Sequence, residues 1–158
     1  MTEILDMDMS CIDGVVEVEN ACFTLPWTRE DFVREVEVNK MAVYKVAVVD
    51  GKVAGYAGMW HIVNEGHITN IAVSPDYRRM GIGEMLLKAL FDVAVEREMI
   101  GVTLEVRISN SAAQKMYTKN GFRPEGFRKR YYQDTGEDAV IMWKYFETYE
   151  DYDKVKDL

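Results

Sequence analysis

The sequence has few cysteines and no pattern of metal ligands. Its 158 residues include two cysteines, Cys11 and Cys22. On one helix the two thiols would lie ~16 Å apart, at a rise of about 1.5 Å per residue, which is beyond disulfide reach. The two histidines, His61 and His67, flank an expected hairpin without a third ligand. We therefore expect reduced thiols and no metal.

Long apolar runs and a basic leader are also missing. No stretch approaches the length that crosses a membrane, and the charged residues among the first six are Glu3 and Asp6. We expect no membrane partner and a cytoplasmic protein. Lys and Arg number 19 against 27 Asp and Glu, a net charge of −8. Direct nucleic-acid binding needs a basic footprint and is not expected, whereas an amine substrate suits an acidic protein.

The length and composition fit one folded domain. With 48% apolar and 29% charged residues, the chain can bury a sizeable core. Charged and mostly acidic residues dominate its last dozen positions. We expect a single domain over residues 1–146 and an acidic tail over residues 147–158.

The spacing of apolar residues divides the chain into strands and helices. Ser10 and Thr28 are placed to cap two early helices, and Asp31 can complete a capping box with Thr28. Three antiparallel strands follow, and Asp50-Gly51 is a strong hairpin signal between the first two. The expected strands cover residues 2–7, 41–49, 52–62, 67–73 and 102–108 and a last hairpin from 122 to 143; the expected helices cover 11–22, 28–36, 82–99 and 111–120.

The order of these elements predicts an α/β protein with one mixed sheet. A strand, a loop with its helix, and a second strand form a βαβ unit between residues 67 and 108. The two strands of such a unit are parallel, with a right-handed crossover. The whole order is βααβββαβαββ, with helices on both faces of the sheet.

The stretch from Asn70 to Glu84 contains the most informative motif, Arg78-x-x-Gly81-x-Gly83. A glycine-bearing loop between a strand and a helix offers unpaired N–H groups and the positive end of the helix dipole to an anion. It is not a P-loop, since no Gly-Lys-Ser/Thr follows, and a dinucleotide fingerprint would need glycine at Leu86. We expect a pyrophosphate at the start of this helix; a surface turn with solvated arginines is the alternative.

This loop resembles the acetyl-CoA pyrophosphate loop of the GNAT (Gcn5-related) N-acetyltransferases, and the element order is that of the GNAT fold. A second motif lies between Leu104 and Phe122 and reads Leu-Glu-Val-Arg-x-Ser-Asn-x-Ala-Ala-x-x-x-Tyr-x-x-x-Gly-Phe. It resembles the C-terminal signature of the RimI group, the ribosomal-protein-alanine N-acetyltransferases. Phe23-x-x-Pro26-Trp27-Thr28 upstream, and residues 128–132 and 137–142 downstream, extend the resemblance over most of the chain.

The resemblance implies that acetyl-CoA is the cosubstrate. In the GNAT fold a central parallel strand pair splays at a bulge, here near residues 70–73, and admits the pantetheine arm. Backbone groups of Ile71 and Val73 would bond the arm and the thioester carbonyl. Glu84 departs from this picture, because a carboxylate at a helix N-terminus competes with phosphate for the same donors. The residues implied to bind acetyl-CoA are Ile71, Ala72, Val73, Arg78, Arg79, Met80, Gly81, Ile82, Gly83, Glu84, Asn110 and Tyr117.

The resemblance also implies two catalytic residues. Glu105 would be the general base: an N-terminal ammonium has a pKa near ~8, against ~10.4 for lysine, so a carboxylate can assist an α-amine more easily. Tyr117 would give a proton to the departing thiolate. From the residues alone, Glu105 can equally be a strand carboxylate paired with an arginine and Tyr117 a core aromatic. Asn110 can equally be a helix cap.

The expected reaction is acetyl transfer from acetyl-CoA to a protein N-terminus. The resemblance implies direct attack in a ternary complex, with the N-terminal alanine of a small-subunit ribosomal protein as acceptor. Trp27, Tyr131 and Tyr132 would line the peptide side, although ordinary rim aromatics are the alternative. Two rival functions stay open: acetylation of a small amine or a lysine side chain, and a non-catalytic acyl-CoA-binding regulatory module. The presence of both Glu105 and Tyr117 favours an enzyme.

Overall fold

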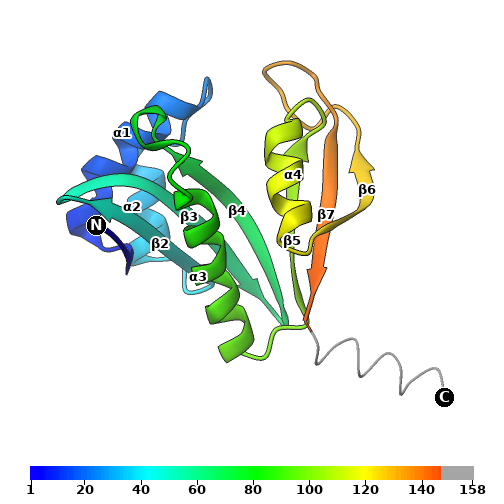
Figure 1. The fold of residues 1–158 in the computed structure, drawn as a ribbon, viewed down its shortest axis with the longest axis horizontal. Helices are drawn as coiled ribbons and strands as arrows, with labels where there is room; N and C mark the ends of the chain where they lie inside the picture. The colour runs from blue at the N-terminus through cyan, green and yellow to red at the C-terminus, as the bar shows by residue number, and fades with distance from the viewer. Residues whose placement is uncertain (147–158) are drawn as a thin grey trace. The chain divides into compact units, whose positions relative to one another are not determined.

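The computed structural model describes residues 1–146, and the predicted acidic tail at 147–158 lies outside the described residues (Figure 1). The helices and strands follow the predicted order βααβββαβαββ, with 3-10 turns at Met9–Cys11 and Pro75–Tyr77. The bounds are β1 Thr2–Asp6, α1 Ile12–Cys22, α2 Arg29–Glu37, β2 Ala42–Val49, β3 Lys52–Ile62, β4 Glu65–Val73, α3 Ile82–Glu96, β5 Gly101–Arg107, α4 Ser111–Lys119, β6 Arg123–Arg128 and β7 Ala139–Tyr145.

The strands form one mixed sheet in the order β1-β2-β3-β4-β5-β7-β6. β4 and β5 are parallel, from the pair Glu65↔Gly101 to the pair His67↔Thr103, which confirms the predicted βαβ unit. β7 lies between β5 and β6 and is antiparallel to both. The chain divides into two compact units, residues 1–61 with 68–93 and residues 62–67 with the segment from 94 onward. That the chain forms one domain stays a prediction. The splay of β4 and β5 at a bulge also stays a prediction.

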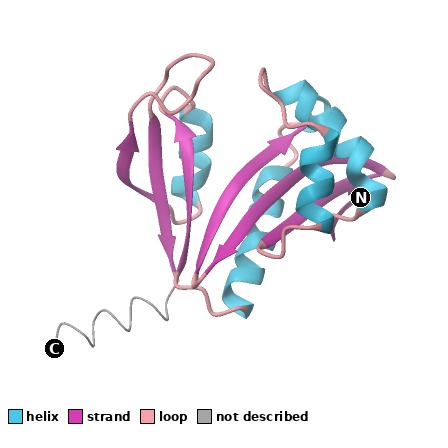
Figure 2. Ribbon diagram, turned by 180° about the vertical axis from the view of Figure 1, so that it is seen from behind, coloured by secondary structure: helices cyan, strands magenta, loops and turns pink. Residues whose placement is uncertain are grey.

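In the first unit, α1 and α2 cover one face of β1–β3 and α3 covers the other (Figures 1 and 2). The core between the sheet and the first two helices is built from large buried side chains, among them Ile12, Phe32 and Tyr56. The predicted capping box is confirmed: the Asp31 N–H donates to the Thr28 hydroxyl, and the Thr28 N–H donates to the Asp31 carboxylate. This pair fixes where α2 begins.

Ser10 was expected to cap α1, and that prediction is wrong. The helix is preceded by a 3-10 turn, and Asp8 caps this turn by accepting the Ser10 N–H. The Ser10 hydroxyl donates to the same carboxylate. Because the Asp8 side chain takes both groups, Ser10 is a donor here and α1 starts without a side-chain cap.

Tight turns join the strands that lead into the site. Asp50 and Gly51 have φ of 50° and 82°, the left-handed pair that a two-residue type I′ hairpin requires. The next turn comes earlier than predicted, because β3 ends at Ile62 and β4 already starts at Glu65. Gly55 lets β3 approach β4 closely, since a Cβ at this position would lie 2.7 Å from the Ala72 carbonyl oxygen.

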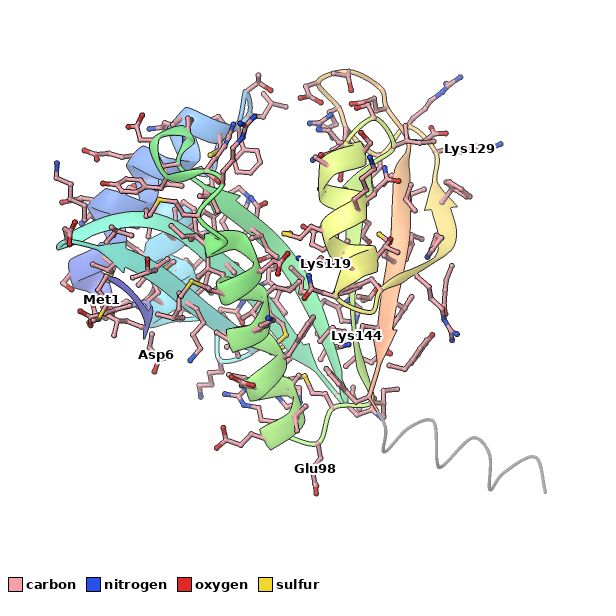
Figure 3. The ribbon with its side chains drawn as sticks, viewed as in Figure 1. Met1, Asp6, Glu98, Lys119, Lys129 and Lys144 are labelled. Carbon is pink, nitrogen blue, oxygen red and sulfur yellow. The ribbon has the colours of Figure 1, made fainter. Side chains whose placement is uncertain are left out.

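In the second unit, α4 covers one face of β5, β7 and β6 (Figure 2). Lys119 lies at the end of this helix (Figure 3), and Gly121, with φ of 97°, carries the chain out of it. Phe122 is buried and its ring meets that of Tyr117 edge-on at 5.5 Å. None of the helices in residues 1–146 is both long and apolar enough to cross a membrane.

Candidate active site

The end of β4 carries the first group of predicted cosubstrate residues. Ala72 is buried, whereas Ile71 and Val73 are half-buried. The Val73 carbonyl accepts hydrogen bonds from the Cys22 thiol at 3.3 Å and from the Arg78 Nε at 3.4 Å. These contacts hold the strand end, the end of α1 and the first arginine of the loop together.

Both cysteines are free thiols, as the sequence predicted. Cys22 is half-buried, and this burial raises the pKa of its thiol, opposed by the Arg78 guanidinium nearby. A thiol with a raised pKa stays protonated at neutral pH and can donate to the Val73 carbonyl. The role that the structure gives Cys22 is therefore that of a hydrogen-bond donor.

The loop before α3 has the backbone shape expected of an anion site. Arg79 and Gly81 have φ of 65° and 78°, so the chain turns twice through the left-handed region within three residues. The Gly81 carbonyl accepts the Met85 N–H at 3.0 Å and closes the first turn of α3. Ile82 is buried and anchors the helix start, while Arg78, Arg79, Met80 and Gly81 are exposed. The first N–H groups of α3 therefore point toward an exposed, arginine-bearing loop.

Gly83 and Glu84 lie in the first turn of α3, and both are half-buried. Glu84 brings an acidic side chain to this turn, as the sequence indicated. The basic charge beside this turn comes from Arg78 and Arg79 in the loop that precedes α3.

Trp27 lies between α1 and α2 and is half-buried. Its ring packs against Phe32 with the ring centres 5.4 Å apart. Its backbone N–H donates to the carboxylate of Glu19 at 3.1 Å. The sequence analysis missed Glu19, although the signal was present: Glu19 is one and two turns from Val15 and Ile12 on the apolar face of α1.

Glu105 is half-buried on β5 and accepts a hydrogen bond from the Arg128 Nε at 3.0 Å. The predicted alternative, a strand carboxylate paired with an arginine, is therefore present. An ion pair this exposed, with 55% of the Arg128 side chain accessible, is weak and can be exchanged for another cation. Lys129, next in the chain, points away from the strands (Figure 3).

Tyr117 is buried on α4, with 8% of its surface exposed. Burial raises the pKa of Tyr117 to about 12, and Tyr132 contributes to this shift. The phenol is therefore protonated at neutral pH and remains a hydrogen donor. That is the state which the predicted acid role requires, and it is also the state of an ordinary core tyrosine.

Asn110 is the N-cap of α4. Its side-chain oxygen accepts the Ala113 N–H at 3.1 Å. The structure thus gives Asn110 the cap role that the sequence left open, and the contact with pantetheine stays a prediction.

Arg107 organises the connection between β6 and β7. Its guanidinium donates to Asp134 at 2.8 Å and to Glu137 at 3.1 Å, and it lies over the Tyr132 ring at 4.0 Å. The Tyr131 ring meets that of Tyr132 edge-on at 5.1 Å. Two ion pairs and one cation–π contact, all made by the Arg107 guanidinium, fix the position of this connection.

The predicted residues thus form two groups, one in each compact unit. The first group holds Trp27, Ile71–Val73 and the loop before α3. The second group holds Glu105, Tyr117 and the two tyrosines of the β6–β7 connection, where the charge of Glu105 acts on both Tyr131 and Tyr132. Burial, opposed by Arg107, raises the pKa of Tyr132 to about 12, so this side chain is also a neutral phenol.

The sequence matches the model of the Acetyltransferase (GNAT) family over residues 12–122. A Bacillus subtilis relative, provisionally named a ribosomal protein bS18-alanine N-acetyltransferase, is 44% identical over 140 residues that cover 89% of this chain and 93% of the relative.

Solved structures agree in fold. The ribosomal-protein-S18-alanine N-acetyltransferase of Escherichia coli superimposes with a TM-score of 0.84 at 31% identity, over 92% of this chain and 94% of that one. The PaiA N-acetyltransferase of Thermoplasma acidophilum, solved with coenzyme A, shares the fold with a TM-score of 0.79 at 19% identity, over 92% of this chain and 99% of that one. The chain belongs to the GNAT family of acetyltransferases.

Proposed function

We propose that this protein transfers the acetyl group of acetyl-CoA to the N-terminal α-amine of a protein, and that its acceptor is the N-terminal alanine of the small-subunit ribosomal protein bS18. The observation that carries this proposal is the near full-length similarity to two bS18-alanine N-acetyltransferases, at 44% and 31% identity. The motif between Leu104 and Phe122 supports the same assignment.

Acetyl-CoA binding is assigned to the end of β4 and the loop before α3. The two arginines, the left-handed turns at Arg79 and Gly81, and the N-terminus of α3 suit the pyrophosphate. The backbone of Ile71 and Val73 would bond the pantetheine arm, and an N–H aimed at the thioester carbonyl would stabilise the oxyanion.

The proposed chemistry is a direct attack. The neutral α-amine forms a bond to the thioester carbon, and Glu105 takes the proton that the nitrogen loses. The carbon–sulfur bond then breaks, and Tyr117 donates its proton toward the leaving thiolate. The products are the N-acetylated protein and free coenzyme A. The pair between Glu105 and Arg128 is compatible with this role, because a partly exposed guanidinium can give way to the incoming amine.

The test uses a panel of peptides with acetyl-CoA, with the products identified by mass. A peptide with a free N-terminal alanine should be acetylated on its α-amine. A matched peptide with a blocked N-terminus and an internal lysine should not react. If the lysine peptide alone reacts, the enzyme is a lysine acetyltransferase, and if acetyl-CoA binds without turnover of any peptide or small amine, the protein is a binding module.

The catalytic residues have their own test. Glu105→Gln and Tyr117→Phe should each lower kcat by ~10²- to 10⁴-fold, the usual loss of one acid–base group. Lys129→Gln is the matched control, because this side chain is exposed and points away from the strands. A double variant that turns over at the parental rate would remove both residues from the mechanism.

A further inference from the structure

Glu19 lies on the buried face of α1, and 1% of its surface is exposed. Its two oxygens accept from uncharged donors, the Tyr56 hydroxyl at 2.8 Å and the Trp27 N–H at 3.1 Å. Among residues 1–146 no cation is paired with it. A carboxylate without a counterion is costly to bury, and an apolar residue at this helix position would avoid that cost.

Glu19 holds the connection between α1 and α2 with its backbone carbonyl and its side chain. The backbone carbonyl of Glu19 accepts the Phe23 N–H at 3.0 Å, and its side chain accepts the Trp27 N–H. A single residue therefore ties both ends of the segment from Phe23 to Trp27. Pro26 has no N–H, so Trp27 supplies the donor at the end of this segment.

The Glu19 carboxylate also reaches β4 through Tyr56. The Tyr56 hydroxyl has one hydrogen, which it donates to Glu19, so it accepts from the Asn70 side-chain amide at 3.0 Å. The amide oxygen of Asn70 then accepts the Ile71 N–H at 3.1 Å. The carboxylate thus takes the Tyr56 hydrogen, and Tyr56 and Asn70 connect Glu19 to the backbone of Ile71.

A second, apolar connection runs beside these hydrogen bonds. The Trp27 ring packs on Phe32, and the Phe32 ring meets that of Tyr56 edge-on at 5.3 Å. Trp27 and Tyr56 are therefore joined twice, once through Glu19 and once through Phe32. The hydrogen bonds to Glu19 and the ring contacts to Phe32 therefore both hold Trp27 in position relative to Tyr56.

We propose that Glu19 is a positioning residue for acetyl transfer: through Trp27 and through Tyr56 with Asn70 it holds the acceptor-binding segment in register with the strand that carries Ile71. The inference rests on the proposed function, which assigns Ile71 to acetyl-CoA, and on the prediction from the sequence that Trp27 lines the peptide side. Glu19 itself touches neither substrate. All five residues, Glu19, Trp27, Tyr56, Asn70 and Ile71, belong to the first compact unit.

The first test replaces Glu19 by methionine, which is similar in length and has no carboxylate. A merely structural carboxylate predicts a changed Tm, because the Tyr56 hydroxyl and the Trp27 N–H lose their acceptor, and unchanged kinetics of the folded enzyme. A positioning role predicts that kcat/KM for the peptide falls by about 10- to 100-fold, since small misplacements of bound substrate cost this much. The dissociation constant of acetyl-CoA, held mainly by the loop before α3, should change by less than about twofold.

Two further variants sharpen the comparison. Glu19→Gln keeps the size and one acceptor oxygen and should recover part of the lost kcat/KM. Glu17→Gln makes the same change on an exposed position of the same helix and should leave the kinetics as they are.

The connection between Glu19 and Asn70 is tested by combining variants. The two side chains meet through the Tyr56 hydroxyl, which donates to Glu19 and accepts from Asn70. If they act as one unit, Glu19→Gln with Asn70→Ala should lose no more kcat/KM than the worse single variant. Effects that multiply would show two independent roles and would contradict the proposal.

A measurement independent of turnover is hydrogen exchange at the Trp27 amide. This N–H donates to a buried carboxylate, so its exchange should be slow in the parent and at least about 10-fold faster in Glu19→Met. Wild-type exchange together with wild-type kcat/KM in this variant would overturn the proposal. If the parent acetylates no peptide, the proposed function fails, whereas the exchange at Trp27 still reports whether Glu19 holds the segment.

Discussion

At the scale of single residues, Tyr117 and Glu19 are both buried and ionisable, and their raised pKa values affect different properties of the protein. Tyr117 is a neutral donor whose proton is held firmly, because burial raises its pKa to about 12. Glu19 is an acid in a site that penalises its charge, so burial raises its pKa as well. Under the proposed mechanism the first matters for the rate of the reaction, and the second matters for how the stability of the fold depends on pH.

The raised pKa of Tyr117 predicts the shape of the pH–rate profile. Between about pH 6 and about pH 10 the phenol stays protonated, so no loss of rate in this range comes from Tyr117. Tyr117→Phe should therefore lower kcat at every pH without moving the pH at which the rate changes. Peptide acetylation measured across this range checks the prediction. An alkaline decline present in the parent and missing in Tyr117→Phe would contradict it.

The raised pKa of Glu19 predicts how stability depends on pH. Desolvation is the main cause, and the charge of Asp31 adds to it, while the bonds from Tyr56 and Trp27 oppose it. The folded state therefore binds the Glu19 proton more tightly than the unfolded state does. This contribution to stability is full below the unfolded pKa of about 4.5 and is lost as the pH rises through the folded value. Glu19→Gln cannot ionise, so its Tm relative to the parent should increase with pH.

Thermal unfolding of the two proteins at a series of pH values measures this difference. Glu17→Gln serves as the control and should follow the parent, because Glu17 is exposed. A difference in Tm between Glu19→Gln and the parent that stays constant with pH would show that the folded pKa of Glu19 is not raised.

At the scale of helices, strands and loops, the turn before α3 is where one side chain should matter most for the cosubstrate. A Cβ at Gly81 would meet no atom within 4 Å, but its φ of 78° is unfavourable for most residues. Gly81→Asp adds a negative charge where we place the pyrophosphate and should raise the dissociation constant of acetyl-CoA by about 10-fold or more.

Gly81→Asn is the matched variant, because asparagine tolerates the left-handed region and carries no charge. Calorimetric titration with acetyl-CoA should show a much smaller loss of affinity for it than for Gly81→Asp. Equal losses in the two variants would mean that backbone strain, and not charge, weakens binding, and the pyrophosphate would then lie elsewhere.

Local sequence signals predicted most of these elements and few of the contacts between them. Thr28 with Asp31 and the dipeptide Asp50-Gly51 act on their own neighbours, so their roles were visible in the sequence. The prediction that Ser10 caps α1 was wrong because Asp8, two residues earlier, caps the 3-10 turn that precedes the helix and accepts the Ser10 N–H. Glu19 was not predicted, although it follows Ile12 and Val15 at helical spacing; its partner Tyr56 is 37 residues away and follows only from packing.

The candidate site shows the same division. The loop motif and the residues Glu105 and Tyr117 were found from resemblance, because those residue types recur at fixed spacing. Arg107 was not assigned a role, since its partners in the β6–β7 connection lie 27 and 30 residues downstream. Pairings over such distances leave no local pattern in a single sequence.

At the scale of the whole molecule, binding of acetyl-CoA should stabilise the fold. A ligand at about 100 times its dissociation constant adds ~2.7 kcal/mol to the free energy of unfolding. For a protein of this size each kcal/mol raises Tm by roughly 2–4 °C, so an increase of about 5–10 °C is expected. Thermal unfolding with and without acetyl-CoA measures it, and the increase should be smaller in Gly81→Asp. No increase at a saturating concentration would exclude acetyl-CoA as the cosubstrate.

The fixed β6–β7 connection has a consequence for the cost of binding. A loop that becomes ordered only when a peptide arrives loses conformational entropy at that moment, and this loss weakens binding. Here Arg107 already holds Asp134, Glu137 and the Tyr132 ring in place. The entropy of this loop is lost during folding, so a peptide that binds at Tyr131 and Tyr132, as the sequence predicts, would meet aromatic side chains whose arrangement is already set.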